Sequence, residues 1–181
     1  MRIFSVLIIS ILFSLPSFVV SQSYQLDSSS IVKVIGSSNL RDWTAVAGIK
    51  TLELEGEIDQ FSSVLFSLDT KSLEGGRGES MDAKIYKALK STTNQFITFS
   101  SKMIEVNGEK ISAEGDLTIA GHTEKINLNF EYQKIGNQIQ LIANIPLKMS
   151  TYGVDPPTAL FGQIVAKDDI TIDFTLTLSK K

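Results

Sequence analysis

The sequence predicts an all-β protein: an antiparallel β-barrel of about eight strands with one short helix. Long stretches of its second half alternate strictly between apolar and polar residues, as a strand with one buried face does. Two-residue turn signals separate these stretches, at Asn107-Gly108, Gly121-His122 and Gly136-Asn137. None of the alternating stretches has helical periodicity, so the fold class depends on strands.

The turn positions predict a register in which apolar residues face apolar residues. A slip by one residue would place each of them opposite a polar partner, so the pattern specifies the pairing strongly. Across the Gly121-His122 turn the expected pairs are Leu117–Ile126, Gly115–Leu128, Ala113–Phe130 and Ile111–Tyr132. Across the Gly136-Asn137 turn they are Tyr132–Leu141, Phe130–Ala143, Leu128–Ile145 and Ile126–Leu147.

The strand before Asn107 changes phase part-way along. Ile97 is apolar in the odd phase, whereas Ile104 and Val106 are apolar in the even phase. One extra residue near Lys102-Met103 would restore an apolar pairing of Ile97 with Leu117, and the sequence therefore predicts a β-bulge there.

The first half of the chain predicts further strands over 31–36, 44–58 and 62–69. It also predicts one helix over 81–90, with Ser80 as its N-cap and Asp82 in its first turn. Basic residues suit the last turn of a helix, and here they are Lys87 and Lys90. The expected buried stripe of the helix consists of Met81, Ile85, Ala88 and Leu89.

Residues 1–21 predict a cleaved secretory signal peptide, which leaves 22–181 as a single domain. Arg2 supplies a positive start, residues 3–15 are mostly apolar, and residues 19–21 offer small or modest side chains for cleavage. The apolar run is shorter than the roughly 20 residues that a membrane-spanning helix needs. The mature domain is therefore expected in the periplasm or secreted.

Composition excludes several classes of function. The chain has no cysteine, one histidine and a net charge of −3. These numbers argue against disulfides, a zinc site, a Ser-His-Asp triad and a nucleic-acid partner. His122 lies at an expected turn tip, so we expect its side chain to be exposed and to have no catalytic or metal-binding role. We therefore expect no enzyme activity, no cofactor and no metal.

Long strands that are apolar on one side must enclose that side, and one short helix cannot cover it. A barrel of eight strands is near the size that side chains just fill, or that leaves room for one slender ligand. The small inward residues Ala113, Gly115 and Ala143 favour an open lumen. Aromatic residues of the helix and loops could instead fill it, and the pattern alone leaves both alternatives open.

Several segments in a fixed order add a family resemblance. They are Gly36-Ser-Ser-Asn-Leu-Arg-Asp-Trp43, Lys71-Ser-Leu73, Met81-Asp82, Ala88-Leu89-Lys90, Ile97-Thr-Phe99, Gly115-Asp-Leu-Thr-Ile-Ala-Gly-His-Thr123 and Tyr152-Gly-Val-Asp-Pro-Pro-Thr-Ala-Leu-Phe-Gly162. Together they resemble the YceI-like family of exported polyisoprenoid-binding proteins, over essentially all of residues 22–181. The resemblance implies a lipocalin-like barrel whose apolar channel holds an isoprenoid chain or another long amphiphile. Arg41 stands where members often carry histidine, and His122 where an aliphatic residue is commoner.

The resulting hypothesis is a carrier, sequestering agent or sensor for a long-chain apolar small molecule. That molecule is expected to be isoprenoid-quinone-like or fatty-acid-like. Transient contact of the protein with a membrane and formation of a homodimer are further expected interactions. The alternative is a filled-core β-barrel that serves as a stress or interaction module without a lipid.

The candidate ligand-binding residues lie on the inward phase of the strands, on the helix and in two loops. Arg41 is the candidate for contact with a ligand head group; the alternative is that it forms a salt bridge to Asp42 or another acid. Trp43 either lines the channel mouth or plugs the barrel end, and Phe161 either forms the entrance or caps the core. The full candidate set is Trp43, Leu54, Phe66, Ile85, Leu89, Phe99, Ala113, Gly115, Leu117, Leu128, Phe130, Ala143, Ile145, Tyr152, Phe161 and Phe174.

Overall fold

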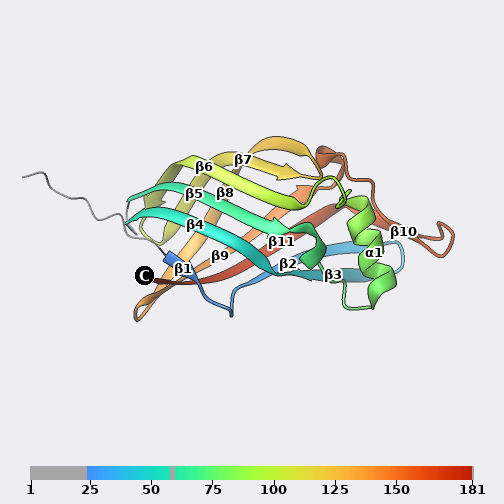
Figure 1. Ribbon diagram of the computed structural model, residues 1–181, viewed down its shortest axis with the longest axis horizontal. Helices are drawn as coiled ribbons and strands as arrows, with labels where there is room; N and C mark the ends of the chain where they lie inside the picture. Colours follow the sequence, from blue (N-terminus) through green and yellow to red (C-terminus); the bar gives the residue numbers. More distant parts are fainter. Residues whose placement is uncertain (1–23, 58–59, 181) are drawn as a thin grey trace, which may run out of the picture.

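One antiparallel sheet curls strongly on itself, and one short helix lies at one end of it (Figure 1). The computed structural model describes residues 24–57 and 60–180; the predicted signal peptide lies outside them. The all-β, lipocalin-like fold class is confirmed. The strands are β1 (Tyr24–Leu26), β2 (Ile31–Ser38), β3 (Asp42–Ala47), β4 (Ile49–Glu57), β5 (Gln60–Asp69), β6 (Phe96–Asn107), β7 (Lys110–Ile119), β8 (His122–Ile135), β9 (Gln138–Lys148), β10 (Thr158–Ala159) and β11 (Ile164–Lys180). The helices are α1 (Glu79–Ala88) and two 3₁₀ turns, η1 (Thr70–Ser72) and η2 (Ser150–Tyr152).

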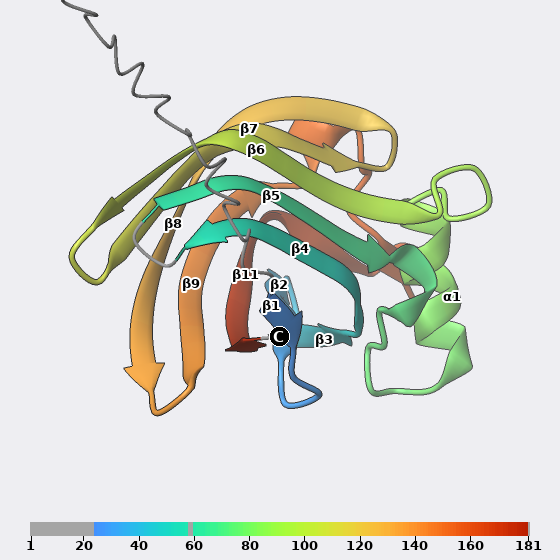
Figure 2. The same cartoon turned by 60° about the vertical axis from the view of Figure 1, so that its left-hand side comes forward.

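The strand order of the sheet is β3-β2-β11-β9-β8-β7-β6-β5-β4, with β1 and β10 paired to β11. Figure 2 shows the sheet curling from β4 and β5 over β6 and β7 and down through β8 and β9. The first and last strands of this path, β3 and β4, are joined by Gly48 alone. The single strand predicted over 44–58 is therefore two strands, of which β3 pairs with β2 and β4 with β5.

The Gly136-Asn137 turn forms as predicted, with Ile135 paired to Gln138 and Tyr132 to Leu141. The other two registers were wrong by two residues, because the chain turns at 108–109 and 120–121 instead. Ala120 and Gly121 both have positive φ, and glycine suits the second position of such a turn. Five expected pairs are therefore absent: Leu117–Ile126, Gly115–Leu128, Ala113–Phe130, Ile111–Tyr132 and Ile97–Leu117. In their place, and in the same order, the structure has Leu117–Glu124, Gly115–Ile126, Ala113–Leu128, Ile111–Phe130 and Phe99–Leu117.

These corrections leave every side chain on its predicted face. Moving a two-residue turn by one position shifts the register by two, and side chains alternate with a period of two. Ala113, Leu117 and Leu128 are all buried, as the inward phase requires.

The ladder between β8 and β9 is shorter than predicted. It covers only 131–135 of β8 and 138–142 of β9, so the expected Phe130–Ala143, Leu128–Ile145 and Ile126–Leu147 pairs are absent from it. Beyond that point β8 continues beside β7 and β9 continues beside β11. The 3₁₀ turn η2, which follows β9, contacts both strands there.

The predicted β-bulge is confirmed between Ser101 and Met103, with Lys102 as the extra residue. Ser101 is buried, and its hydroxyl accepts a hydrogen bond from Met103 N (3.0 Å) and donates one to Glu114 O (2.6 Å). The hydroxyl thus serves backbone groups that the extra residue removes from the regular ladder.

Helix α1 begins and ends two residues earlier than predicted. Gly78, with φ of 87°, occupies the N-cap position, so Ser80 is not the cap. Lys90 lies beyond the helix with φ of 52°, a left-handed conformation that ends helices. The predicted stripe of Met81, Ile85, Ala88 and Leu89 is only partly buried. These side chains border a cavity instead of packing fully against the sheet.

Candidate ligand-binding cavity

The curled sheet encloses an inner cavity of about 110 Å³, which we call the lumen. All of its lining side chains are aliphatic or aromatic, and they come from β2, β4 to β9, β11 and the segment after η1. Nine of the candidate residues line it: Leu54, Phe66, Phe99, Ala113, Leu117, Leu128, Phe130, Ile145 and Phe174.

Aromatic side chains narrow the lumen without filling it. Phe174 contacts Phe66 and Phe130 edge to face, with ring centroids 5.8 and 5.9 Å apart. Phe61 makes a similar contact with Tyr24 at a centroid distance of 5.9 Å, near the end of the barrel where β1 meets the last residues of β11. These rings belong to strands and not to the helix and loops that the filled alternative invoked, and the interior still holds a cavity.

A second cavity of about 410 Å³ lies at the end of the barrel that carries α1; we call it the mouth. It is bordered by α1, by the β2–β3 turn and by the β10–β11 hairpin. Six aliphatic residues line both cavities, so the mouth adjoins the lumen through one apolar collar. The collar consists of Val34, Leu73, Ile97, Ile119, Leu147 and Ile172.

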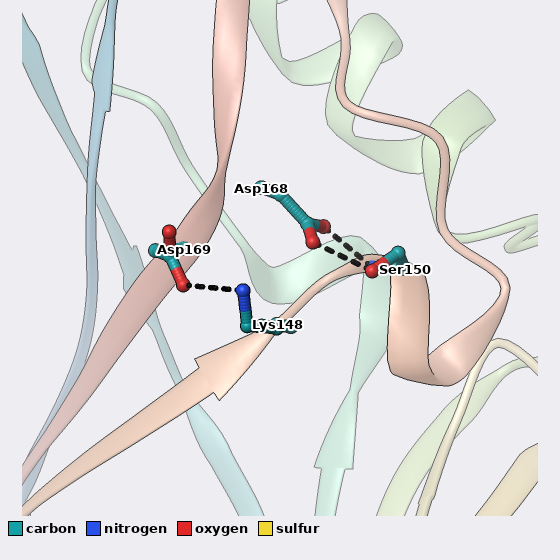
Figure 3. A network of polar contacts seen from close by, with 4 residues as sticks. All are labelled: Lys148, Ser150, Asp168 and Asp169. Atoms are coloured by element: carbon teal, nitrogen blue, oxygen red, sulfur yellow. Dashed lines mark hydrogen bonds and ion pairs between the residues drawn. The ribbon is translucent and has the colours of Figure 1, made fainter.

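Basic side chains distinguish the mouth from the lumen. The described residues that line it include Arg41, Arg77, Lys84 and Lys148, and no aspartate or glutamate. Lys148 is paired with Asp169 at 3.3 Å, the one ion pair among the side chains that the structure describes (Figure 3). The salt bridge considered for Arg41 is thus not formed with any described acid. A ligand would meet an apolar interior and a cationic rim.

Trp43 lines the mouth and does not plug the barrel end. Its indole N–H donates to Ser37 O at 3.1 Å, which fixes the ring across β2. The ring lies so close to its cross-strand partner Gly36 that a Cβ atom at Gly36 would overlap it. The glycine in the Gly36-to-Trp43 segment therefore makes room for the tryptophan.

The η2 turn places Tyr152 beside the mouth. Asp168 of β11 accepts hydrogen bonds from Ser150 N (2.7 Å) and Ser150 Oγ (2.6 Å) at the start of this turn (Figure 3). These bonds, with the Ser150 hydroxyl the larger influence, hold the pKa of the Asp168 carboxyl below its ordinary value. Met149, the N-cap residue of η2, makes no capping hydrogen bond with its side chain. Asp168 supplies the hydrogen-bond acceptor at this end of the turn instead.

Tyr152 is 2% exposed, and its hydroxyl has no hydrogen-bond partner among the described residues. Burial, with a smaller contribution from the nearby Glu124 carboxylate, raises the pKa of Tyr152. The phenol therefore stays protonated and offers an unused donor next to the mouth.

Comparison with known proteins agrees with this geometry. A family model described as the YceI-like domain matches residues 24–178. The chain belongs to the YceI-like domain family. No curated protein sequence matches it significantly.

Solved structures share the YceI-like fold at low sequence identity. BcnA of Burkholderia cenocepacia superposes with a TM-score of 0.72 and 18% identity, over 84% of this chain and 99% of that one. A polyisoprenoid binding domain from Saccharophagus degradans, implicated in plant cell wall breakdown, gives 0.69 and 13%, over 88% and 99%. The YceI protein of Campylobacter jejuni gives 0.60 and 20%, over 75% and 84%.

Most candidate residues of this YceI-like chain border one of the two cavities. Arg41, Trp43, Ile85, Leu89 and Tyr152 line the mouth. Three do not border either cavity. The space beside Gly115 is taken by Phe99 and Ser101, Ala143 is buried outside the lining, and Phe161 is fully exposed at a loop tip, where it neither caps the core nor forms the entrance.

Sequence reasoning missed the basic residues Arg77, Lys84 and Lys148 of the rim. Arg77 precedes α1, Lys84 is not in the buried stripe predicted for the helix, and Lys148 ends β9. Only the placement of α1 across the barrel end brings them together. Among the described residues, no group of three or more metal-binding side chains occurs, and no helix is long and apolar enough to span a bilayer.

Acid is expected to weaken the η2 anchor. Because the folded-state pKa of Asp168 is lowered, its contribution to stability is present above its ordinary value of 3.8 and is lost as pH falls below it. Thermal unfolding of wild type, Asp168→Asn and Asp116→Asn should be compared between pH 7 and pH 2.5. Wild type and the Asp116 variant should lose more stability in acid than Asp168→Asn. Equal losses in all three proteins would contradict this role.

Two tyrosines form a matched pair for a second prediction. Tyr86 donates its hydroxyl hydrogen bond to Lys71 O at 2.9 Å, whereas the Tyr152 hydroxyl has no described partner. Tyr152→Phe should leave the free energy of unfolding unchanged or raise it by about 1 kcal/mol, while Tyr86→Phe should lower it. Urea denaturation at pH 7 measures both. A clear loss of stability in Tyr152→Phe would show that its hydroxyl is satisfied in solution.

Proposed function

We propose that this YceI-like chain is an exported, non-enzymatic protein that binds a long-chain amphiphile, of which an isoprenoid is the leading class. The observation that carries the proposal is that a wholly apolar lumen adjoins a larger mouth whose rim is basic, with six apolar residues lining both. The apolar tail would enter the lumen, and the polar end would remain at the mouth.

The sizes of the two cavities support this orientation. The mouth, at about 410 Å³, lies within the usual range of about 300–1,000 Å³ for small-molecule sites. The lumen is narrow and suits a slender chain, for which each buried methylene contributes about 0.8 kcal/mol. A bilayer offers a chain nearly the same free energy, so transfer between membrane and protein would be reversible. Selectivity would then depend on the mouth.

Two further observations favour a lipid carrier. The S. degradans structure of similar fold is described as a polyisoprenoid binding domain. In addition, the described residues that line the lumen include no acid, base or nucleophile that could act in catalysis. A predicted signal peptide over residues 1–21 is consistent with a site of action outside the cytoplasm.

The second candidate is a filled-core module without a lipid, which the Phe66–Phe174–Phe130 contacts favour because these three rings line the lumen and pack against one another. Titration of the purified, delipidated protein with geranylgeraniol and with palmitate separates the two. Trp43, the one tryptophan, lines the mouth and should report binding through its fluorescence. Saturable changes with dissociation constants of about 1 μM or lower support the carrier, and no change with either probe supports the filled core.

A further inference from the structure

Two loop tips at the mouth display apolar side chains to solvent. Leu40, in the β2–β3 turn, is 64% exposed, and Leu160, in the β10–β11 loop, is 62% exposed. Phe161 is fully exposed beside Leu160, and Val165 at the start of β11 is 42% exposed. Figure 1 shows the β10–β11 loop projecting beyond α1 at this end of the molecule.

The two tips form one connected unit. Asn39, next to Leu40, donates from its amide side chain to Gln163 O (2.8 Å) and accepts from Val165 N (2.9 Å). Its backbone N–H also donates to Val165 O at 3.1 Å. Within the β10–β11 loop, Gly162 N donates to Ala159 O and Gln163 N to Leu160 O, both at 3.1 Å. The apolar side chains are therefore presented by hydrogen-bonded backbone and not by a loose segment.

Two residues of the β10–β11 loop have an uncommon backbone conformation. Leu160 and Phe161 have φ of 48° and 56°, a left-handed conformation that residues other than glycine rarely adopt. Such residues persist where the surroundings specify them and are frequent at binding sites. A sequence that needed only a turn here would suit glycine or asparagine better than leucine and phenylalanine.

The tips also border the mouth. Leu160 belongs to both, since it is exposed and lines the mouth cavity. Arg41 follows Leu40 directly and lines the same cavity, together with Arg77 and Lys84 of the α1 region. Apolar side chains flanked by basic ones are the composition of segments that enter the interface of an anionic bilayer.

We propose that Leu40, Leu160, Phe161 and Val165 form a membrane-docking tip, and that the basic rim of the mouth contacts anionic lipid head groups. Docking turns the mouth toward the bilayer, so that an apolar chain passes between membrane and lumen without crossing water. The route of transfer rests on the proposed function, whereas docking itself does not. A projecting pair of tips fits a deformable bilayer better than a second protein, which would need a flat or complementary surface of far larger area.

The test compares wild type with the double variant Leu40→Ser/Phe161→Ser, neither residue of which lines a cavity. The vesicles contain phosphatidylcholine, either alone or with an equal amount of phosphatidylglycerol, and a trace of dansyl-labelled lipid. Binding is measured as fluorescence energy transfer from Trp43 to the dansyl group. Wild type should bind the anionic vesicles, bind the neutral ones more weakly, and release as salt is raised. The double variant should bind anionic vesicles at least about tenfold more weakly.

Ile135→Ser is the control, because Ile135 is also a large apolar residue and is 53% exposed. It lies at the β8–β9 turn, at the start of β9, whereas Lys148 at the other end of β9 lines the mouth. It should bind vesicles as wild type does. Wild-type affinity in the double variant, equal binding to both kinds of vesicle, or a tip-dependent dimer in sedimentation velocity without vesicle binding would each overturn the proposal. Geranylgeraniol titration of the same proteins tests the carrier function separately. Solution binding without vesicle binding refutes only docking, and vesicle binding without geranylgeraniol binding refutes only the carrier.

Discussion

Replacement of Gly115 by alanine is expected to lower the free energy of unfolding by about 3 kcal/mol, the upper end of the usual cost of overpacking a core. A Cβ atom at Gly115 would overlap the carbonyl oxygen of Ser100 and approach Phe99 Cζ to 2.9 Å. The carbonyl belongs to the neighbouring strand β6, so relief requires a shift of backbone beside the bulge and not a change of rotamer.

Gly48→Ala is the matched control for this prediction. A Cβ atom at Gly48 would have Ser72 Cβ as its nearest neighbour, at an ordinary contact distance of 3.7 Å. Its free energy of unfolding should change by no more than about 0.5 kcal/mol. Denaturant unfolding of the three proteins decides the point, and equal stability of Gly115→Ala and wild type would mean that the β6–β7 pairing differs from the one described.

Filling the lumen should weaken the binding of a long-chain ligand. Ala113 is buried and lines the lumen, with its partner Leu128 on β8. Ala113→Phe would place a phenyl ring in a cavity of only about 110 Å³ and leave no path for a chain. The dissociation constant for geranylgeraniol should rise at least about tenfold, since that corresponds to the loss of about two buried methylenes.

Thr175→Phe provides the control, because Thr175 is exposed on β11 and borders neither cavity. It adds a similar ring without entering the barrel and should bind as wild type does. Circular dichroism and thermal unfolding establish that Ala113→Phe remains folded. Undiminished affinity in a folded Ala113→Phe protein would place the ligand elsewhere.

The fold was largely predictable because strand alternation is a local signal. The inward face of β7, the bulge at Lys102 and the turn at Gly136 all follow from a period of two and from turn chemistry. Register was less predictable, because either of two adjacent turn positions keeps the same faces inward. Ala120 in a left-handed conformation had no sequence signal, and the strands β1 and β10 are too short to show any period.

The residues of the candidate site were likewise predictable only where a local pattern specified them. Inward residues such as Leu54 and Phe174 were identified because alternation specifies which side chains point inward. Gly115 was misjudged because an absent side chain leaves space only if no neighbour occupies it, and Phe99 does. The rim was missed because Arg77 and Lys84 approach Arg41 only through the tertiary placement of α1, which no local pattern encodes.

Native mass spectrometry of the protein isolated from its own host, without delipidation, tests the central claim most directly. A bound apolar molecule that is released on unfolding, identified after organic extraction and absent from Ala113→Phe protein prepared in parallel, is the predicted result. A single species at the mass of the bare polypeptide, combined with a crystal structure in which side chains occupy both lumen and mouth, would contradict it.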